Sequence, residues 1–464
     1  MTRTPRRSFL QISAAAATVG ALGNFASPML ASDPVPGDRP AQDESVTVLN
    51  PRNRVPLAFI IDDSTCLVNL NRFAIPQFAA GWGYKKYEQD WRKMPVEIPD
   101  DFVRKFGEWC GEREIKGKYS IVPYPACVGR IDREVPGWTN RQLTASIDLV
   151  RDLMMPNWDI HPEMVTHTRV IDTKTGHPIP RFGQEYMENW RWADGKSVDE
   201  LTDYLSYALR ILKNVGLPCE GITTPGGFGS GVKGELAQAT SESIRDVFGA
   251  EIPHYFKYVT DSGGASVEPR VEFASGLDSA DPQCVVSIVA CTGDWIGGWD
   301  CSNRGDVDKF ITSDLSGGRM VEVIDRGEPA LMLCHWTGIY FNGEEVGFKV
   351  FQEAVRRMHA KYDNLRWMKL SEIARYWAAK ELTSIEKTAD RIRFTAPFAA
   401  PDFTIRVATN SETAPRLRVD GKSVMFAEVK DPLRLTANKF WCGTDGYDTI
   451  CFNLPKGRSD VVLS

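Results

Sequence analysis

Two adjacent carboxylates, Asp62 and Asp63, end an unbroken apolar run that begins at Leu57. Apolar residues without polar alternation are typical of a strand covered on both faces, as in α/β proteins. Because neighbouring strand residues point to opposite faces, the two carboxylates can share one polar pocket only where the strand stops. There they could take different tasks, such as binding a metal and moving a proton. The alternative is two solvated loop carboxylates that cap Ser64 and Thr65.

Three of the six histidines also stand near strand ends. His335 follows the apolar run 330–334, a position that suits a general acid, although a structural histidine bonded to a carbonyl fits as well. His161 and His167 flank a five-residue segment. With an aspartate they could form a three-ligand metal site with an open position for water. Their spacing is not that of a helical metal pair, so they would have to converge through a loop.

Further acids and aromatic residues lie near the same strand ends. Asp294-Trp295 and Trp299-Asp300 place an acid beside a tryptophan twice in a glycine-rich loop, which fits a sugar-binding subsite or a packed loop with paired acids. Glu163 stands between the two histidines. Such carboxylates could alternatively run a glycosidase mechanism, in which one acts as acid and the other as base or nucleophile.

The elements that must position these residues alternate between strands and helices. About eight candidate strands alternate with helices between residues 54 and 382, which predicts parallel strands with crossover helices. Polar residues follow most of the strands: Asp62, Asp63, His161, Thr223, Thr224, Asp261, Asp294 and His335. Carboxyl ends of strands converge on one face of a β/α barrel, so we predict an α/β fold with a distorted (β/α) barrel. A doubly wound sheet would need a nucleotide-binding loop, and the run 226–231 lacks the required glycine order.

The pattern changes near residue 383. Short runs of near-alternating polarity, punctuated by proline, aspartate and glycine, predict a small C-terminal β-sandwich domain over residues 383–464.

The N-terminal segment of the chain indicates an exported protein. Arg6-Arg7 precedes a small apolar stretch, which predicts a twin-arginine signal peptide over residues 1–31, a linker over 32–53, and a periplasmic or secreted location. The 464 residues carry a net charge of -6, which argues against a nucleic-acid partner. No other segment has the length and apolarity of a membrane span.

The ten cysteines form no C-x-x-C pair, which argues against a structural zinc knuckle. Export permits disulfides, and Cys442 with Cys451 or Cys291 with Cys301 could pair. Free buried thiols are equally consistent with the sequence.

The motifs together resemble the polysaccharide deacetylase (NodB-homology) superfamily over roughly residues 54–380. The run 59–63 resembles its first motif, 163–168 the front half of its second, 223–226 its third without the arginine, and 331–335 its last. Ile171 stands where the second motif should place its second histidine. The resemblance implies a distorted barrel that acts on carbohydrates, with Asp62 as catalytic base and Asp63 as metal ligand.

From the residues and this resemblance we predict an exported carbohydrate-active hydrolase that removes an acyl group from a polysaccharide or oligosaccharide. Asp63, His167 and His161 would bind a divalent metal, and zinc is the metal that we expect. His335 would protonate the leaving group. The predicted substrate-binding residues are Glu163, Thr224, Asp294, Trp295, Trp299 and Trp336. A metal-free glycoside hydrolase on the same barrel and a non-catalytic glycan-binding protein are the two alternatives.

Overall fold

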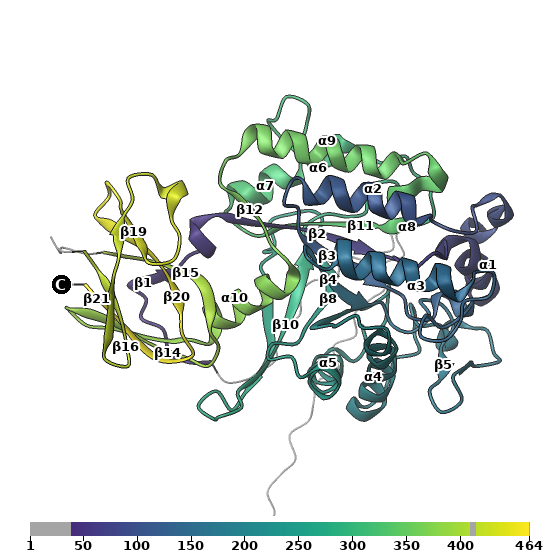
Figure 1. Cartoon of the computed structure of the whole chain (residues 1–464), viewed down its shortest axis with the longest axis horizontal. Helices are drawn as coiled ribbons and strands as arrows, with labels where there is room; N and C mark the ends of the chain where they lie inside the picture. Colours follow the sequence, from purple (N-terminus) through teal and green to yellow (C-terminus); the bar gives the residue numbers. More distant parts are fainter. Residues whose placement is uncertain (1–38, 409–413, 464) are drawn as a thin grey trace, which may run out of the picture.

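The computed structural model describes residues 39–408 and 414–463, and its α/β part contains two mainly parallel sheets (Figure 1). The first has the order β11 (Ala330–His335), β2 (Val55–Asp62), β3 (Gly117–Ile121) and β4 (Trp158–Pro162), with β12 (Leu365–Trp367) also paired to β2. The second has the order β7 (Gly221–Thr223), β8 (His254–Val259), β10 (Gln283–Ala290) and β9 (Arg270–Ser275). The edge strand β9 was not predicted, and it alone runs antiparallel to its neighbour.

The two sheets meet at two seams. Glu163, directly after β4, forms a single parallel bridge with Thr223 of β7. On the other side, Cys291 N donates a hydrogen bond of 2.8 Å to Leu331 O of β11. The mixed α/β class is therefore confirmed. Within the described residues, however, the strand ladders form two sheets that approach each other and not one closed barrel.

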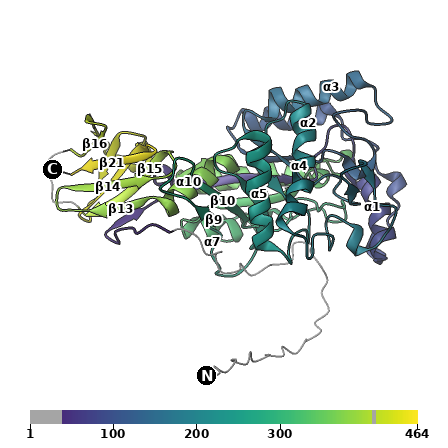
Figure 2. The same ribbon diagram turned by 90° about the horizontal axis from the view of Figure 1, so that it is seen from below.

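Helices cover the outer faces of these sheets, with α2, α3 and α9 on one side and α4 and α5 on another (Figures 1 and 2). The longer helices are α1 (Leu70–Trp82), α2 (Asp100–Gly111), α3 (Asn140–Leu149), α4 (Val198–Asn214), α5 (Lys233–Phe248), α9 (Val346–Lys361) and α10 (Leu370–Leu382). The shorter ones are α6 (Val307–Phe310), α7 (Arg319–Asp325) and α8 (Trp336–Tyr340). A small hairpin, β5 (Ile171–Asp172) with β6 (His177–Pro178), lies apart from the sheets.

The apolar run of β2 is buried on both faces, as predicted. Phe59 points outward and stacks on Phe351 of α9, with ring centroids 3.8 Å apart. Ala58 and Ile60 point to the interior that the two sheets enclose, and they share a core with Leu331 of β11. Because both faces are covered by apolar groups, the strand needs no polar alternation until it reaches Asp62.

The C-terminal part consists of two antiparallel-rich sheets. One has the order β1 (Val46–Val48), β15 (Ala400–Ala408), β20 (Tyr447–Leu454), β19 (Lys439–Cys442) and β18 (Ala427–Glu428). The other has the order β13 (Ser384–Lys387), β14 (Arg391–Ala396), β21 (Gly457–Val462), β16 (Arg416–Val419) and β17 (Lys422–Met425). The run 433–436 is one of the short runs that the alternating pattern indicated as a strand, and this prediction is wrong. Pro432 and the Asp431 carboxylate, which accepts from Leu433 N at 2.9 Å, start a turn of 3-10 helix instead.

Strand β1 belongs to the stretch that the sequence indicated as a linker. It pairs with β15 from Val46↔Val407 to Val48↔Ile405 and so forms an edge of the C-terminal sheet. The predicted signal peptide at 1–31 and the first residues of the predicted linker lie outside the described residues.

The C-terminal sheets lie at one end of the molecule and α1 lies at the other (Figures 1 and 2). Helix α10 lies between these sheets and β10. At the junction the buried Asp402 carboxylate of β15 binds Arg52 at 2.9 Å and Arg366 of β12 at 3.0 Å. Strand β2 begins near this junction and α1 follows its end, so its carboxyl end faces away from the C-terminal sheets (Figure 1).

All ten cysteines are free thiols, so neither Cys442 and Cys451 nor Cys291 and Cys301 form a disulfide. Among the described residues, no helix has both the length and the apolar character that crossing a bilayer requires.

Candidate functional site

Asp62 and Asp63 lie at the carboxyl end of β2, where the backbone turns sharply. Asp62 pairs in register with His335, the last residue of the neighbouring strand β11. Asp63 has a φ of 62°, in the left-handed region that non-glycine residues seldom adopt. Its N–H donates to Glu163 Oε2 at 2.7 Å. This turn allows two consecutive carboxylates to serve one buried site, which a continuing strand would not permit.

Asp63, Glu163 and His167 form a compact buried cluster. Asp63 Oδ1 lies 3.1 Å from His167 Nε2, and Glu163 Oε1 lies 3.4 Å from His167 Nδ1. One ligand atom from each residue falls within 4.8 Å of the others. Burial lowers the pKa of His167, but the two carboxylates outweigh this effect and raise it to about 9. Burial raises the pKa of Glu163, but His167 outweighs this effect and lowers it to about 2.

The donor set of this cluster fits a divalent cation. Asp63 Oδ1 is buried and has no hydrogen-bond partner among the described residues. It faces His167 Nε2 at a distance close to the roughly 3 Å that separates two ligands of one zinc ion. Two carboxylates and one imidazole are ligands that zinc and manganese both accept. The sequence placed Glu163 with the substrate, whereas the structure places it where a third ligand would stand.

The turn that carries His167 is held by a carboxylate that the sequence did not indicate. Glu188 accepts hydrogen bonds from the backbone N–H groups of Val165 at 3.3 Å, Thr166 at 2.9 Å and His167 at 2.6 Å. The Tyr204 hydroxyl donates to the same carboxylate. Glu188 lies in an irregular loop that no pattern marked, and only its position in the fold brings it to His167.

A second residue that the sequence did not indicate, Lys118 of β3, contacts Asp62 from the interior between the two sheets. Its ammonium group donates to Asp62 Oδ1, to Ile61 O at 2.9 Å and to Ser120 Oγ at 2.8 Å. Burial raises the pKa of Asp62 to about 7, against the opposing effect of this ammonium. In the sequence Lys118 stands directly before the short run 119–122, and no pattern there linked it to Asp62.

His335 is oriented by Asp294, which the sequence had placed among the substrate-binding residues. Asp294 Oδ2 lies 2.7 Å from His335 Nδ1. Burial lowers the pKa of His335, but Asp294 and Asp63 outweigh this effect and raise it to about 10. A protonated imidazole at this point can donate a proton from Nε2, the role that the sequence predicted for His335.

His161 does not join Asp63 and His167, so the predicted metal set needs correction. It lies two residues before Glu163 on β4, roughly 7 Å deeper along the strand. There its Nε2 faces His254 Nε2 at 3.0 Å, and Asp159 lies close to both rings. Burial lowers the pKa of both histidines, that of His254 to about 4. Both rings are therefore neutral, and one shared proton satisfies the two facing nitrogens.

The four remaining predicted residues divide between the core and the site. Trp336 is fully buried against Phe102 and Phe106 and is inaccessible to a substrate, which corrects that prediction. Trp295 packs on Phe310 in the core. Thr224 donates to Phe256 O at 3.3 Å. Of these four, only Trp299 lies in an aromatic cluster near His167.

That cluster connects the site to the surface. Phe78 contacts the His167 ring edge-on at a centroid distance of 6.3 Å and Trp299 at 5.6 Å. Trp82 stacks on Phe78 and lies 5.2 Å from Trp190. The half-exposed indoles offer flat apolar surface beside the polar cluster, a combination that suits a ring-shaped, partly polar substrate.

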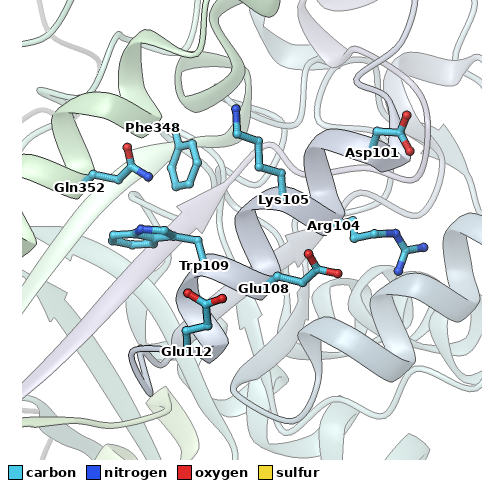
Figure 3. Close-up of a pocket in the computed structure, with 8 residues that line it drawn as sticks. All are labelled: Asp101, Arg104, Lys105, Glu108, Trp109, Glu112, Phe348 and Gln352. Atoms are coloured by element: carbon cyan, nitrogen blue, oxygen red, sulfur yellow. The ribbon is translucent and has the colours of Figure 1, made fainter.

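A separate hollow involves none of the residues above. It has a volume of about 340 Å³ and lies between α2 and α9 (Figure 3). It is lined by Asp101, Arg104, Lys105, Glu108, Trp109, Glu112, Phe348 and Gln352. Its lining is a mixture of both charges, and it contributes nothing to the carboxyl-end cluster.

Comparison with known proteins gave structural neighbours only. No family model and no curated protein matches the chain. Among solved structures, a polysaccharide deacetylase from Mycobacterium smegmatis matches with 14% identity and a TM-score of 0.39, over 76% of this chain and 98% of that one. A polysaccharide deacetylase from Pseudomonas aeruginosa PAO1 matches with 10% identity and a TM-score of 0.37, over 70% and 91%. A Puue allantoinase matches with 11% identity and a TM-score of 0.34, over 71% and 91%.

Proposed function

We propose that the protein is an exported hydrolase that removes acyl groups from a polysaccharide or oligosaccharide with the help of a divalent metal. The observation that carries the proposal is the meeting of three kinds of group at one set of strand ends. These are a ligand cluster of Asp63, Glu163 and His167, a separate carboxylate at Asp62, and a protonated imidazole at His335. Hydrolysis of an ester or amide requires an activated water, a base and an acid, and this set supplies each of them.

Asp63 and His167, with Glu163 beside them, would hold the metal, and zinc is the ion we propose first. When bound, such an ion polarises the acyl carbonyl and acidifies a water molecule. Glu163 accepts the Asp63 N–H and faces His167 Nδ1, so it also orients the other two side chains.

The residues of the chain move the protons. Asp62 takes a proton from the water molecule while the oxygen of that water forms a bond to the acyl carbon. The bond between that carbon and the sugar oxygen or nitrogen then breaks. His335, held through Nδ1 by Asp294, donates the Nε2 proton to the departing atom. The products are the free acid and the deacylated sugar.

The carboxylates of the site argue against the glycosidase alternative. Asp62 is bound by Lys118, Glu163 by His167 and Asp294 by His335. A glycosidase needs one carboxyl group that donates a proton and a second that attacks or activates water. Burial raises the pKa of Asp62 to about 7, so Asp62 could serve as the acid, but Glu163 and Asp294 each face a histidine, which leaves no second carboxylate of this cluster for the attack.

The sequence predicted a signal peptide at 1–31, a linker over 32–53, a barrel over 54–382 and a β-sandwich over 383–464. We propose the same division of the chain, with two α/β sheets in place of a closed barrel and with β1 of the linker added to the β-sandwich. Export to the periplasm or the medium rests on the Arg6-Arg7 segment alone. The β-sandwich lies at the end of the molecule opposite the carboxyl end of β2 (Figure 1). We therefore propose that it stabilises the rest of the fold and takes no part in the site.

The decisive experiment is product analysis with purified, zinc-loaded protein. Acetylated xylan and an N-acetylated chitooligosaccharide are incubated with it, and free acetate is measured by NMR alongside a reducing-end assay. Acetate without new reducing ends supports the proposal, and new reducing ends without acetate contradict it. His167→Gln should abolish acetate release and metal binding together, while His177→Gln, at an exposed position of the β5–β6 hairpin, should change neither.

A further inference from the structure

Lys118 is a lysine with none of its surface exposed, in the interior that the two sheets enclose. Its ammonium reaches three polar groups, which are Ser120 Oγ, the Asp62 carboxylate and the main-chain Ile61 O, and the ring of Phe256 lies 5.6 Å from it. Taking an ammonium group out of water costs several kcal/mol, and the attraction of a single carboxylate often fails to recover that cost. An apolar pair at these positions would stabilise the fold equally well, so stability alone does not explain the lysine.

The register of the strands fixes the direction from which Lys118 approaches. Lys118 pairs with Ile60 on β2, two residues before Asp62, while His335 pairs with Asp62 itself. The ammonium therefore meets Asp62 from the interior between the two sheets, while His335 stands beside Asp62 at the end of the neighbouring strand. All three ammonium protons are used, by Asp62 Oδ1, Ile61 O and Ser120 Oγ.

We infer that Lys118 is the positioning residue of the proposed base, and this rests on the proposed function. Its ammonium holds Oδ1 of Asp62 by a hydrogen bond. Oδ2, which has no hydrogen-bond partner among the described residues, is then oriented toward the water. Lys118 acts on the reaction only through the orientation of that carboxylate. Without it, Asp62 can rotate away, and a base displaced by about 1 Å loses roughly 100-fold in rate.

Lys118→Met tests the inference, because methionine has similar length and no charge. With 4-methylumbelliferyl acetate as the probe, we expect kcat to fall about 100-fold with KM and zinc content unchanged. Lys116→Met is the matched control, since Lys116 lies two residues earlier, is partly exposed and pairs with Glu372 at 3.0 Å. A Lys118→Met enzyme that keeps its kcat within threefold would overturn the inference.

A double-mutant cycle covers the case in which Lys118→Met fails to fold. Asp62→Asn with Lys118→Met removes both charges together, so no unpaired carboxylate remains buried. If Lys118 acts only through Asp62, this double variant has the same residual kcat as Asp62→Asn alone. A further tenfold loss in the double variant would contradict a positioning role.

Crystal structures separate failure of this inference from failure of the proposed function. We expect the Asp62 carboxylate to leave its rotamer in Lys118→Met and to keep it in Lys116→Met, whether or not either protein releases acetate. An unmoved Asp62 in Lys118→Met would refute the positioning role. An inactive wild-type protein would refute the deacylase proposal alone.

Discussion

His335 Nδ1 and Asp294 Oδ2 lie 2.7 Å apart, so the imidazole presents its other nitrogen to the strand ends. Among the carboxylates that overcome burial and raise the pKa of His335 to about 10, Asp294 has the largest effect. Any change at Asp294 therefore alters both the direction of the ring and its charge.

Asp294→Asn should shift the alkaline limit of the reaction downward. An acid catalyst works only while it is protonated, and removing the carboxylate lowers the pKa of His335 toward its ordinary value. We expect kcat for acetate release to fall by up to about 30-fold at pH 8 and distinctly less at pH 6. Profiles of kcat against pH for the wild type and the variant measure this shift. Equal losses at both pH values would contradict it.

Glu188→Gln should weaken metal binding without touching a ligand directly. A glutamine offers one acceptor oxygen where the carboxylate now binds three backbone N–H groups and the Tyr204 hydroxyl. The turn that carries His167 would loosen, and supporting groups of this kind contribute roughly 10- to 100-fold to metal affinity. Zinc titration by calorimetry measures the change. Glu185→Gln, at an exposed position of the same loop, serves as the control.

His254 should make the fold sensitive to mild acid. Burial lowers the pKa of His254 to about 4. Between about pH 6.5 and pH 4, this histidine is therefore protonated in the unfolded chain and neutral in the folded chain. Stability from this group is complete above about pH 6.5 and is lost as the pH falls toward 4. At pH 5 the loss should be about 2 kcal/mol relative to pH 7. Urea unfolding of His254→Gln should show a flatter pH dependence, whereas His177→Gln should retain that of the wild type.

Gly221→Ala should destabilise the protein through the same histidines. A Cβ atom at this position would lie 2.6 Å from His254 Nε2 and closer still to His161 Nε2. Both rings are buried and held against each other, so relief requires movement of the sheet and costs about 2 kcal/mol. Gly234→Ala, which meets nothing within 4 Å at the start of α5, should instead stabilise by about 0.5 kcal/mol. Chemical unfolding curves of the two variants make the comparison.

Asp402→Ala should weaken the junction between the C-terminal sheets and the rest of the molecule. Its carboxylate is buried and binds two arginines, so its loss leaves the two guanidinium charges without this partner. We expect the free energy of unfolding to fall by about 3 kcal/mol. We expect a lower urea midpoint with unchanged kcat, because the junction lies opposite the site. Asp445→Ala, which removes an exposed partner of Arg406, should leave the midpoint within experimental error.

The strand ends were the part of the site that the sequence could predict. An apolar run that stops on a polar residue is a local pattern, and it identified Asp62, Asp63 and His335 in the correct neighbourhood. Glu188 and Lys118 could not be found in this way, because one lies in an irregular loop and the other at the margin of a strand. Their roles depend on which strands become neighbours, which is a property of the whole fold.

His161 shows the opposite error. Nearness to His167 in the sequence suggested one site. His161, however, lies within β4, whereas His167 lies in the turn that follows the strand. The strand geometry carries His161 inward to His254, and only the turn after Glu163 returns the chain to Asp63. Likewise, alternation of strands and helices predicted parallel pairing, while the antiparallel edge strand β9 and the pairing of β1 with β15 depend on contacts distant in sequence.

The pairing of β1 with β15 has a consequence for how the chain assembles. The C-terminal sheet takes one strand from residues 46–48 and the rest from beyond residue 400, so its edge stays incomplete until nearly the whole chain has been synthesised. Contacts of such large sequence separation form late because closing the intervening loop costs entropy. A ribosome-bound chain that ends near residue 382 would therefore expose β1 as an unpaired edge, a hazard for aggregation that ends only when the last strands arrive.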